Sequence, residues 1–324
     1  MTNFIVGLDI GSSKICVVVG EPGAGGTLEI LGLGQSRSRG VRDGEIVKPE
    51  LVVEDVREAV LEAGQMADVK IRSVYLGATG DHICGLTHCD GHSMVPAISP
   101  DDVGDAVKNA IRLVRAMPLE VDGIVFNGLA SALALLTSEQ MELGALVIDI
   151  GAGTTEFVVF ADGILRFSGI LLNGGRKVSN DLAEGLEIPI SRAEKLKLEH
   201  GSAVVVEATI GQTVAIADEP GLECKLVKIE QMQLIMTLRL ARIFWDIAQD
   251  LEAAGLTARL RAGAFLCGGT ARTPGIEAMA EKILQMKVTT GSVVGISRLT
   301  AANQPEFASA IGLVKYGALR HRPN

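Results

Sequence analysis

Aromatic residues are scarce in this sequence, at 3% of 324 residues, and it contains no long uncharged run. The longest such run, residues 123–138, is too short and too polar to cross a bilayer. The stretch MTNFIVGLDIGSSK has no basic leader and carries Asp9 where a signal peptide would be apolar. We therefore expect no membrane span and no signal peptide, and a cytoplasmic location.

Cysteine and single-sign charge are also limited. The five cysteines are an odd number without regular spacing, which predicts free thiols in a reducing compartment. The 30 basic and 39 acidic residues give a net charge of −9, and no block of like charges occurs. We therefore expect no nucleic-acid partner.

Val, Ile, Leu and Ala are abundant, and strand-like runs alternate with helical ones, which indicates an α/β protein. Its length favours two domains. A repetition supports this: residues 6–19 read VGLDIGSSKICVVV and residues 146–159 read LVIDIGAGTTEFVV. Two apolar strands joined at Asp-Ile-Gly, present twice, predict a duplicated architecture.

Each copy has the features of a phosphate-binding hairpin. Asp9 or Asp149 ends the first strand, and Gly11 or Gly151 allows a tight reversal where backbone N–H groups can approach an anion. Because a strand follows each turn, a Rossmann turn and a Walker A loop are both excluded. The alternative is two ordinary hairpins without a ligand.

Two such hairpins facing each other would hold a polyphosphate. The expected donors are Ser12, Ser13, Lys14, Thr154 and Thr155. The two aspartates would hold Mg²⁺ through its water shell. A third glycine site, in residues 264–283, follows a strand with Gly268-Gly269-Thr270 and predicts a helix beginning near Pro274. Such a turn can lie flat against a nucleoside.

These three motifs, in this order, resemble the superfamily of actin, Hsp70 and sugar kinases, and within it the bacterial cell division family FtsA. Residues 38–83, 173–201 and 305–317 look like further segments of that family. The resemblance implies an α/β, actin-like (RNase H-like) duplicated two-domain fold with an interdomain nucleotide cleft.

The resemblance also implies a division into subdomains. The expected ranges are 1–80, 118–172 and 305–324 for domain 1A, 81–117 for a reduced 1C, 173–201 and 258–304 for 2A, and 202–257 for 2B.

By the same resemblance, the chain would be an ATP- and Mg²⁺-binding adaptor that binds the tubulin-like FtsZ and helps organise the division ring. It would self-assemble into dimers or filaments, and it would be recruited from the cytoplasm to the septum at the inner face of the membrane.

The resemblance assigns the site residues in five groups. The first phosphate motif comprises Asp9, Gly11, Ser12, Ser13 and Lys14, and the second comprises Asp149, Gly151, Gly153, Thr154 and Thr155. Gly174 and Gly175 would face the phosphates, Glu194 and Lys197 the ribose or base, and Gly268, Gly269 and Thr270 the adenosine. Asp9 and Asp149 would hold Mg²⁺ through water.

The spacing of the ribose pair agrees with a helix. Ser191 would be the N-cap with Glu194 three residues later, and Glu194 and Lys197 would share one helical face. The alternative for this pair is a solvated surface salt bridge.

One departure from the family concerns hydrolysis. Actin-like proteins often carry Glu or Gln before the second phosphate hairpin, where it orients the attacking water. Here the corresponding residue in VFNGLASALALLT is Asn127, which can hold a water but is no base. Asn127 is therefore a candidate for orienting water, no other catalytic residue is assigned, and we expect at most a slow ATPase.

Two further departures concern assembly. A helix expected over residues 99–114 is followed directly by the next strand, so dozens of 1C residues are missing around Met117–Leu119. After YGALRHRPN there is no amphipathic helix, so we expect no autonomous membrane binding. On the 2B surface, the family's EPR is replaced by Glu230-Gln231-Met232, with Arg239 and Arg242 as substitute cations.

The stretch GDHICGLTHCDGH, residues 80–92, holds three histidines and two cysteines. Zinc favours tight ligand pairs, whereas Cys84 and Cys89 are separated by four residues. Period two places His82, Cys84 and His88 on one strand face, before a turn at Asp90-Gly91. We therefore interpret this stretch as a 1C hairpin and not as a metal site.

Three alternatives remain open. A pilus-assembly actin-like adaptor of the PilM type is the principal one. A small-molecule kinase would need a catalytic aspartate, for which Asp122 is the only candidate in the relevant stretch. An iron–sulfur activator would use Cys84 and Cys89.

Overall fold

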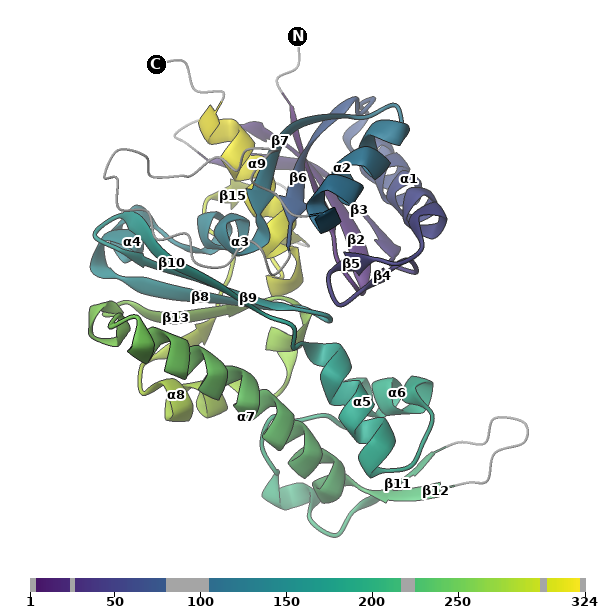
Figure 1. Ribbon diagram of the computed structural model, residues 1–324, viewed down its shortest axis with the longest axis vertical. Helices are drawn as coiled ribbons and strands as arrows, with labels where there is room; N and C mark the ends of the chain where they lie inside the picture. The colour runs from purple at the N-terminus through teal and green to yellow at the C-terminus, as the bar shows by residue number, and fades with distance from the viewer. Residues whose placement is uncertain (1–3, 24–26, 80–104, 217–224, 298–301, 321–324) are drawn as a thin grey trace.

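The computed structural model describes residues 4–23, 27–79, 105–216, 225–297 and 302–320 (Figure 1). These residues form two large β-sheets with helices on their outer faces and two further helices between them, and two small two-stranded sheets. A smaller helical unit extends from the second sheet.

The first sheet has six strands in the spatial order β15-β3-β2-β1-β6-β7. Their bounds are β1 Ile5–Ile10, β2 Lys14–Pro22, β3 Leu28–Arg37, β6 Ser73–Ala78, β7 Glu120–Phe126 and β15 Ile296–Ser297. The strands β1, β2 and β3 are antiparallel neighbours, whereas β6 runs parallel to both β1 and β7.

The second sheet has five strands in the order β10-β9-β8-β13-β14. Their bounds are β8 Ala145–Ile150, β9 Thr155–Ala161, β10 Ile164–Leu171, β13 Gly263–Cys267 and β14 Val288–Thr290. Here β8, β9 and β10 are antiparallel neighbours, and β13 runs parallel to β8 and β14. The pattern repeats that of β3-β2-β1-β6-β7, so the predicted duplicated α/β fold is confirmed.

The helices are α1 Pro49–Ala67, α2 Asp105–Ala116, α3 Asn127–Leu135, α4 Ser138–Leu143, α5 Gly175–Gly185, α6 Ile190–His200, α7 Ile229–Ala253, α8 Ile276–Leu284 and α9 Ala308–Arg320. The first sheet packs against α1 and α2 on one face and against α9 on the other. Helix α3 lies between α9 and the strands β8 and β9, so α3 and α9 join the two halves. None of the described helices is long and apolar enough to span a membrane.

The remaining elements are short. They are β4 Val41–Arg42, β5 Glu45–Ile46, β11 Thr213–Ile216, β12 Lys225–Lys228 and the 3₁₀ turns η3 Glu207–Thr209, η4 Thr257–Arg259, η5 Gly269–Arg272 and η7 Pro305–Phe307. The pair β11–β12 lies with α5, α6 and the first half of α7 in the smaller unit (Figure 1).

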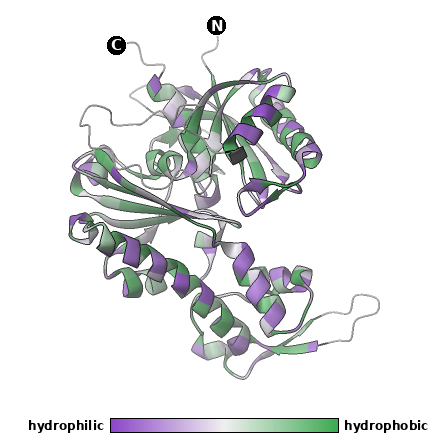
Figure 2. Ribbon diagram, in the orientation of Figure 1, coloured by the Kyte–Doolittle hydropathy of each residue, from purple (hydrophilic) through white to green (hydrophobic). Residues whose placement is uncertain are grey.

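The second sheet is buried on both faces, and β8 shows how its sequence achieves this. Leu146, Ile148 and Ile150 face the core formed with α5 to α8, whereas Ala145 and Val147 face the core shared with α3 and the first sheet. Successive side chains of a strand point to opposite faces, so a continuous apolar run fits this position. By contrast, α7 alternates hydrophilic and hydrophobic residues along its length (Figure 2).

The strand pairing corrects two of the predicted domain boundaries. Residues 118–172 are predicted to belong to domain 1A, but from residue 145 onward they build the second sheet with β13. The physical reason is that the second Asp-Ile-Gly hairpin opens the second repeat. Strand β15, inside the range predicted for 2A, instead pairs with β3 in the first sheet.

Two predicted features fall partly or wholly outside the described residues. The hairpin with the histidines and cysteines, residues 80–92, lies outside them, as do residues 99–104 of the predicted 1C helix. The described part of that helix is α2, which ends at Ala116. The helix predicted near Pro274 is α8, which begins at Ile276.

The contact between α3 and α9 depends on one glycine. A Cβ atom at Gly312 would lie 1.8 Å from the carbonyl oxygen of Ala130, so the two helix backbones are in direct contact. Any side chain at this position would push the helices apart.

We expect Gly312→Ala to destabilise the protein. In an open helix this change is favourable by about 0.5–1 kcal/mol. Here overpacking should reverse the sign and cost about 1–3 kcal/mol. The free energy of unfolding in urea measures this, with Gly269→Ala as control because a Cβ there meets no atom within 4 Å. Equal or greater stability of Gly312→Ala would contradict the close contact.

Candidate functional site

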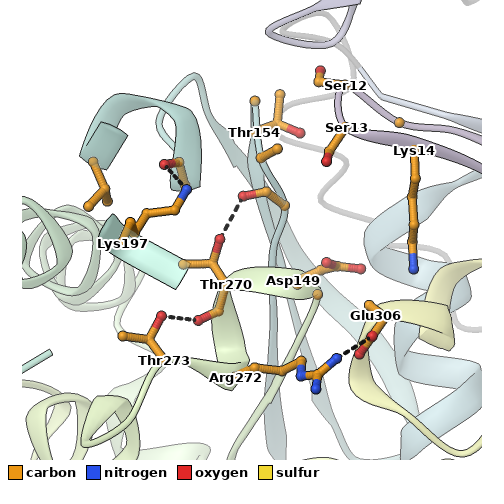
Figure 3. Close-up of a pocket in the computed structure, with 18 of the residues that line it drawn as sticks. Ser12, Ser13, Lys14, Asp149, Thr154, Lys197, Thr270, Arg272, Thr273 and Glu306 are labelled. Atoms are coloured by element: carbon orange, nitrogen blue, oxygen red, sulfur yellow. Dashed lines mark hydrogen bonds and ion pairs between the residues drawn. The ribbon is translucent and has the colours of Figure 1, made fainter. Parts of the chain in front are cut away.

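The two repeated hairpins, one from each sheet, meet at a cavity of about 650 Å³ (Figure 3). The elements α5, α6, α7, η5 and η7 close its other sides. The predicted site residues that line it are Asp9, Gly11, Ser12, Ser13, Lys14, Asn127, Asp149, Gly151, Gly153, Thr154, Gly175, Glu194, Lys197, Gly268, Gly269 and Thr270. Folding therefore brings together residues that are up to 261 positions apart in the sequence, between Asp9 and Thr270.

Two predicted site residues do not line the cavity. Thr155 is fully buried, and its Oγ1 donates a hydrogen bond to the carbonyl oxygen of Asn173 at 2.6 Å. A Cβ atom at Gly174 would lie 2.7 Å from the carbonyl oxygen of Gly151. These contacts hold the start of α5 against the second hairpin, and the direct role of both residues toward phosphate stays a prediction.

The two hairpin turns have the same hydrogen-bond pattern. The N–H of Gly11 donates to the carbonyl oxygen of Lys14 at 3.1 Å, and that of Gly151 donates to the carbonyl oxygen of Thr154 at 2.9 Å. The intervening residues line the cavity, and successive backbone N–H groups in turns of this kind suit an anion.

Contacts between the turns cross from one half of the molecule to the other. Ser12 Oγ accepts from the N–H of Gly44 at 2.9 Å, and a Cβ atom at Gly153 would lie 2.5 Å from that oxygen. Arg176 Nη2, from α5, donates to the carbonyl oxygen of Ser12 at 2.8 Å, and its Nη1 lies 3.9 Å from Asp43 Oδ1. Sequence reasoning missed Arg176, because 164 residues separate it from Ser12.

The two predicted metal-site carboxylates are held by hydroxyl and amide groups. Asp9 accepts from Ser309 Oγ at 2.5 Å and from Asn127 Nδ2 at 3.1 Å. Asp149 accepts from Ser131 Oγ at 2.6 Å. Burial raises the pKa of both carboxyl groups, and that of Asp149 rises to about 6. The nearby negative charge of Asp9 contributes to the raised pKa of Asp149.

A third buried carboxylate, Glu156, was not predicted. It pairs with Asp149 across the β8–β9 ladder and lines the cavity. Thr154 Oγ1 donates to it at 2.9 Å, and Thr79 Oγ1 donates to the same oxygen. Burial, followed by the charge of Asp149, raises the pKa of Glu156 to about 8. An acidic residue inside the apolar strand after GAGTT was the available sequence signal.

Asn127 is the first residue of α3, and its amide orientation is set by Asp9. Its Nδ2 donates to Asp9, while its Oδ1 has no hydrogen-bond partner among the described residues. That oxygen lies against the backbone, since a Cβ atom at Gly77 would be 2.2 Å from it. The geometry therefore shows Asn127 tethering a carboxylate.

Lys14 supplies a cation at the cavity. Its Nζ lies 3.9 Å from the centroid of the Phe307 ring and forms no ion pair with any described residue. Burial lowers its pKa. Figure 3 shows the side chain pointing toward Glu306, which itself accepts from Arg272 at 2.7 Å. A half-buried ammonium that forms no ion pair with a described carboxylate is suited to an anionic ligand.

In the predicted ribose-binding pair, Glu194 and Lys197, the lysine uses its hydrogen-bond donors within the protein. Lys197 Nζ donates to the carbonyl oxygen of Gly175 at 2.9 Å, to Ser179 Oγ at 2.9 Å and to Glu194 Oε2 at 2.7 Å. An ammonium has three donors, so all are used. The predicted N-cap at Ser191 is wrong, because α6 begins at Ile190, directly after Pro189. The pair therefore ties α6 to α5 at the cavity wall.

The third glycine motif packs on the second hairpin. Gly268 has a φ of 83°, and a Cβ atom there would lie 2.4 Å from Asp149 Oδ1, so only glycine fits. Thr270 Oγ1 donates to the carbonyl oxygen of Gly151 at 3.1 Å (Figure 3). Apolar lining by Leu198, Met236 and Leu240, which sequence reasoning missed, completes this end of the cavity.

The donor set fits a magnesium ion held through water. In the described part of the chain, no group of three or more His, Cys, Asp or Glu side chains is arranged to bind a metal directly. Asp9 and Asp149 both line the cavity, and Mg²⁺ prefers oxygen ligands and retains several waters.

The family model and the curated relatives agree on one family. The family model of the cell division protein FtsA matches residues 146–312, just over half of the chain. Cell division protein FtsA of Pseudomonas aeruginosa is 29% identical over 376 aligned residues, which cover 97% of this chain and 89% of that protein. The Escherichia coli K12 protein of the same name is 28% identical over 381 residues, covering 98% and 91%. These alignments exceed the 324 residues of this chain, so the relatives carry residues that it lacks.

Solved structures show the same fold at lower sequence identity. The PilM-PilN type IV pilus biogenesis complex matches with a TM-score of 0.71 and 15% identity, covering 98% of this chain and 99% of that one. MreB 5 of Spiroplasma citri bound to AMPPNP matches with a TM-score of 0.70 and 16% identity, covering 99% and 98%. The predicted actin-like fold is therefore confirmed.

We expect Glu156→Gln to reduce the pH dependence of stability. Between the ordinary pKa of 4.5 and the folded value of about 8, the folded state retains a proton that the unfolded state releases. Stability contributed by that proton is therefore present at low pH and falls as pH rises through this window. Gln needs no proton, so the variant should lose this fall and gain relative stability at the alkaline end.

The measurement is the free energy of unfolding in urea, from about pH 5 to about pH 8. The control is Glu58→Gln, which changes an exposed residue of α1 and should keep the pH slope of the native chain. The decisive comparison is between slopes measured in the same buffers. Identical pH slopes for the native chain and Glu156→Gln would contradict the buried, protonated carboxyl.

Proposed function

The chain belongs to the family of the cell division protein FtsA, and from this we propose that it is an actin-like, ATP-binding adaptor of the division machinery. One observation carries the proposal: two Asp-Ile-Gly hairpins, one from each sheet, meet at a single cavity. A duplicated hairpin pair of this kind suits a polyphosphate held from both sides.

The polyphosphate would lie between the turns that follow Gly11 and Gly151. Their backbone N–H groups would donate to phosphate oxygens, and Lys14 would supply a positive charge that no described carboxylate neutralises by an ion pair. The related fold of MreB5 from Spiroplasma citri is described as bound to AMPPNP and to ADP, which supports this ligand class.

The nucleoside would lie at the other end of the cavity. There the turn at Gly268 and Gly269 presents backbone without side-chain bulk, and Leu198, which is 75% exposed, supplies apolar surface. The Lys197 and Glu194 network would face the ribose, with the ammonium already held by three acceptors.

Mg²⁺ would be held through water by Asp9 and Asp149, and when bound it would neutralise phosphate charge. Binding of a cation favours the ionised form of both carboxyl groups, whose pKa values burial raises. Ser131 and Ser309 orient these carboxylates by donating hydrogen bonds.

We propose that turnover is slow. Asn127 is no base and its Nδ2 is occupied by Asp9. Glu156 has a pKa raised to about 8 and accepts from two threonines, so it is poorly placed to take a proton near neutral pH. The cleft would then act as a conformational and assembly site between a 1A-like first half and a 2A-like second half.

FtsZ is the proposed partner, and the 2B range 202–257 is its proposed docking region. Helix α7 is mainly core, with Met232 fully buried, but Leu234, Leu238 and Trp245 are 50%, 66% and 55% exposed. At 100° per residue these three lie on one narrow stripe.

The arginines of this helix would contribute less to FtsZ binding than its exposed apolar stripe. The substitute cations are already paired, Arg239 with Asp181 at 2.9 Å and Arg242 with Asp246 at 2.8 Å. Apolar contact would therefore dominate docking.

A pilus-assembly adaptor remains the alternative. The similarity to PilM, at 15% identity, supports the fold alone, whereas the family model and the curated relatives support cell division. The two functions can be distinguished by whether the chain binds FtsZ or a PilN-type peptide.

We expect ATP to bind the purified chain and Lys14→Ala to weaken binding about tenfold or more, since a charge-assisted contact at a half-buried position would be lost. Titration with a fluorescent ATP analogue in the presence of Mg²⁺ measures the dissociation constant. Lys282→Ala, which changes an exposed lysine of α8, is the control. The proposal fails if the native chain binds no nucleotide, or if it releases phosphate at about 1 per second or faster.

We expect the chain to bind FtsZ and Leu238→Asp to weaken binding about tenfold or more, because a charge would enter an apolar contact. Surface plasmon resonance with FtsZ from the same organism measures this, and Leu143→Asp is the control, since Leu143 is exposed on α4. Binding of a PilN-type peptide in place of FtsZ would favour the alternative.

A further inference from the structure

A second cavity, of about 1080 Å³, lies at the opposite end of the first sheet from the nucleotide cleft. Its lining comes from the middle of α1, the segment before β6, the end of α2 and the start of β7. Strands β6 and β7 begin at this groove and end at Thr79 and Asn127, which line the cleft. With strands of six and seven residues, the two sites are about 20 Å apart.

The groove has a cationic rim. Arg57, Lys70, Arg72 and Arg115 line it with exposed side chains, and Glu120 is the one acidic residue in its lining. None of these four cations forms an ion pair with another residue in the described ranges. This local excess of positive charge contrasts with the net charge of −9 of the whole chain.

Two acidic residues of α1, Glu54 and Glu62, form hydrogen bonds elsewhere and do not line the groove. Glu54 Oε2 accepts from Arg39 Nη2 at 3.0 Å. Glu62 Oε2 accepts from the backbone N–H of Gln35, in β3, at 2.7 Å. Arg57 and Leu61 lie on the groove side of the same helix.

The floor of the groove is apolar. Ile71, Met117 and Leu119 are buried and form its base, and Leu61 is 62% exposed at its edge. Such a surface buries apolar side chains of a partner while the rim cations meet its charges.

We propose that this groove docks an acidic, extended peptide segment of a partner protein, with apolar side chains against the floor and carboxylates against the four rim cations. The excess of positive charge on the rim favours an acidic occupant. The concave, apolar floor favours a narrow peptide over a flat membrane surface, and the net charge of −9 disfavours a long nucleic acid through repulsion.

The position of the groove makes the proposal independent of the nucleotide site. A peptide bound at the start of β6 and β7 touches none of the residues that line the cleft. The same holds for the exposed stripe on α7, which belongs to the other half of the molecule. Loss of peptide binding can therefore be separated from loss of ATP or FtsZ binding.

The test selects short random peptides, displayed on phage, against the full chain, and measures the enriched peptides by fluorescence anisotropy. The double variant Arg72→Glu with Arg115→Glu reverses two rim charges without entering the core. The matched control is Lys282→Glu with Lys287→Glu, two exposed lysines near β14 in the second half. Thermal unfolding and ATP titration of each variant check that fold and cleft are intact.

We expect the enriched peptides to be acidic with apolar residues, and to bind the rim variant about tenfold or more weakly, which corresponds to about 1.4 kcal/mol. Binding to the control variant should be unchanged, and added salt should weaken binding to the native chain. The proposal is overturned if enriched peptides are not acidic or bind the rim variant equally well. It is also overturned if only a single-stranded oligonucleotide or anionic vesicles bind in a manner that depends on Arg72 and Arg115.

Discussion

Three carboxyl groups, those of Asp9, Asp149 and Glu156, share one buried region where the two sheets meet. Burying them costs free energy, and the surrounding side chains of the site reduce that cost. Burial raises the pKa of each one. Serine and threonine hydroxyl groups donate to all three, and Lys14 supplies the nearest positive charge. A bound cation would stabilise a site of this kind electrostatically, which is one reason why we propose nucleotide with Mg²⁺ as its ligand.

The fold holds this region in place through close backbone contacts. Helices α3 and α9 meet at Gly312, and both contribute to the carboxylate site, through Asn127 and Ser131 from α3 and Ser309 from α9. The glycine turn at Gly268 touches Asp149 directly. The helices and the turn that pack the two halves together also hold the carboxylates. A shift between the two halves would therefore change the hydrogen bonds of the carboxylates.

The first sheet offers different surfaces at its two ends. The carboxyl ends of β1, β6 and β7 contribute anionic and polar groups to the cleft, whereas the amino ends of β6 and β7 border a cationic groove. Since both surfaces are attached to the same strands, the proposed peptide and the proposed nucleotide would not compete for one site. This separation suits the proposed adaptor function.

The amino-acid sequence alone was sufficient to predict the duplicated fold, both Asp-Ile-Gly hairpins and the late glycine turn, because these depend on local strand, turn and glycine chemistry. It was not sufficient to place residues 145–171 in the second sheet or to identify Glu156 and Arg176. It also left open that Asn127 tethers Asp9 and that Lys197 is held by three acceptors. Those features depend on which side chains meet across the cleft, and contacts between residues as distant as Ser12 and Arg176 exist only once the two halves have packed together.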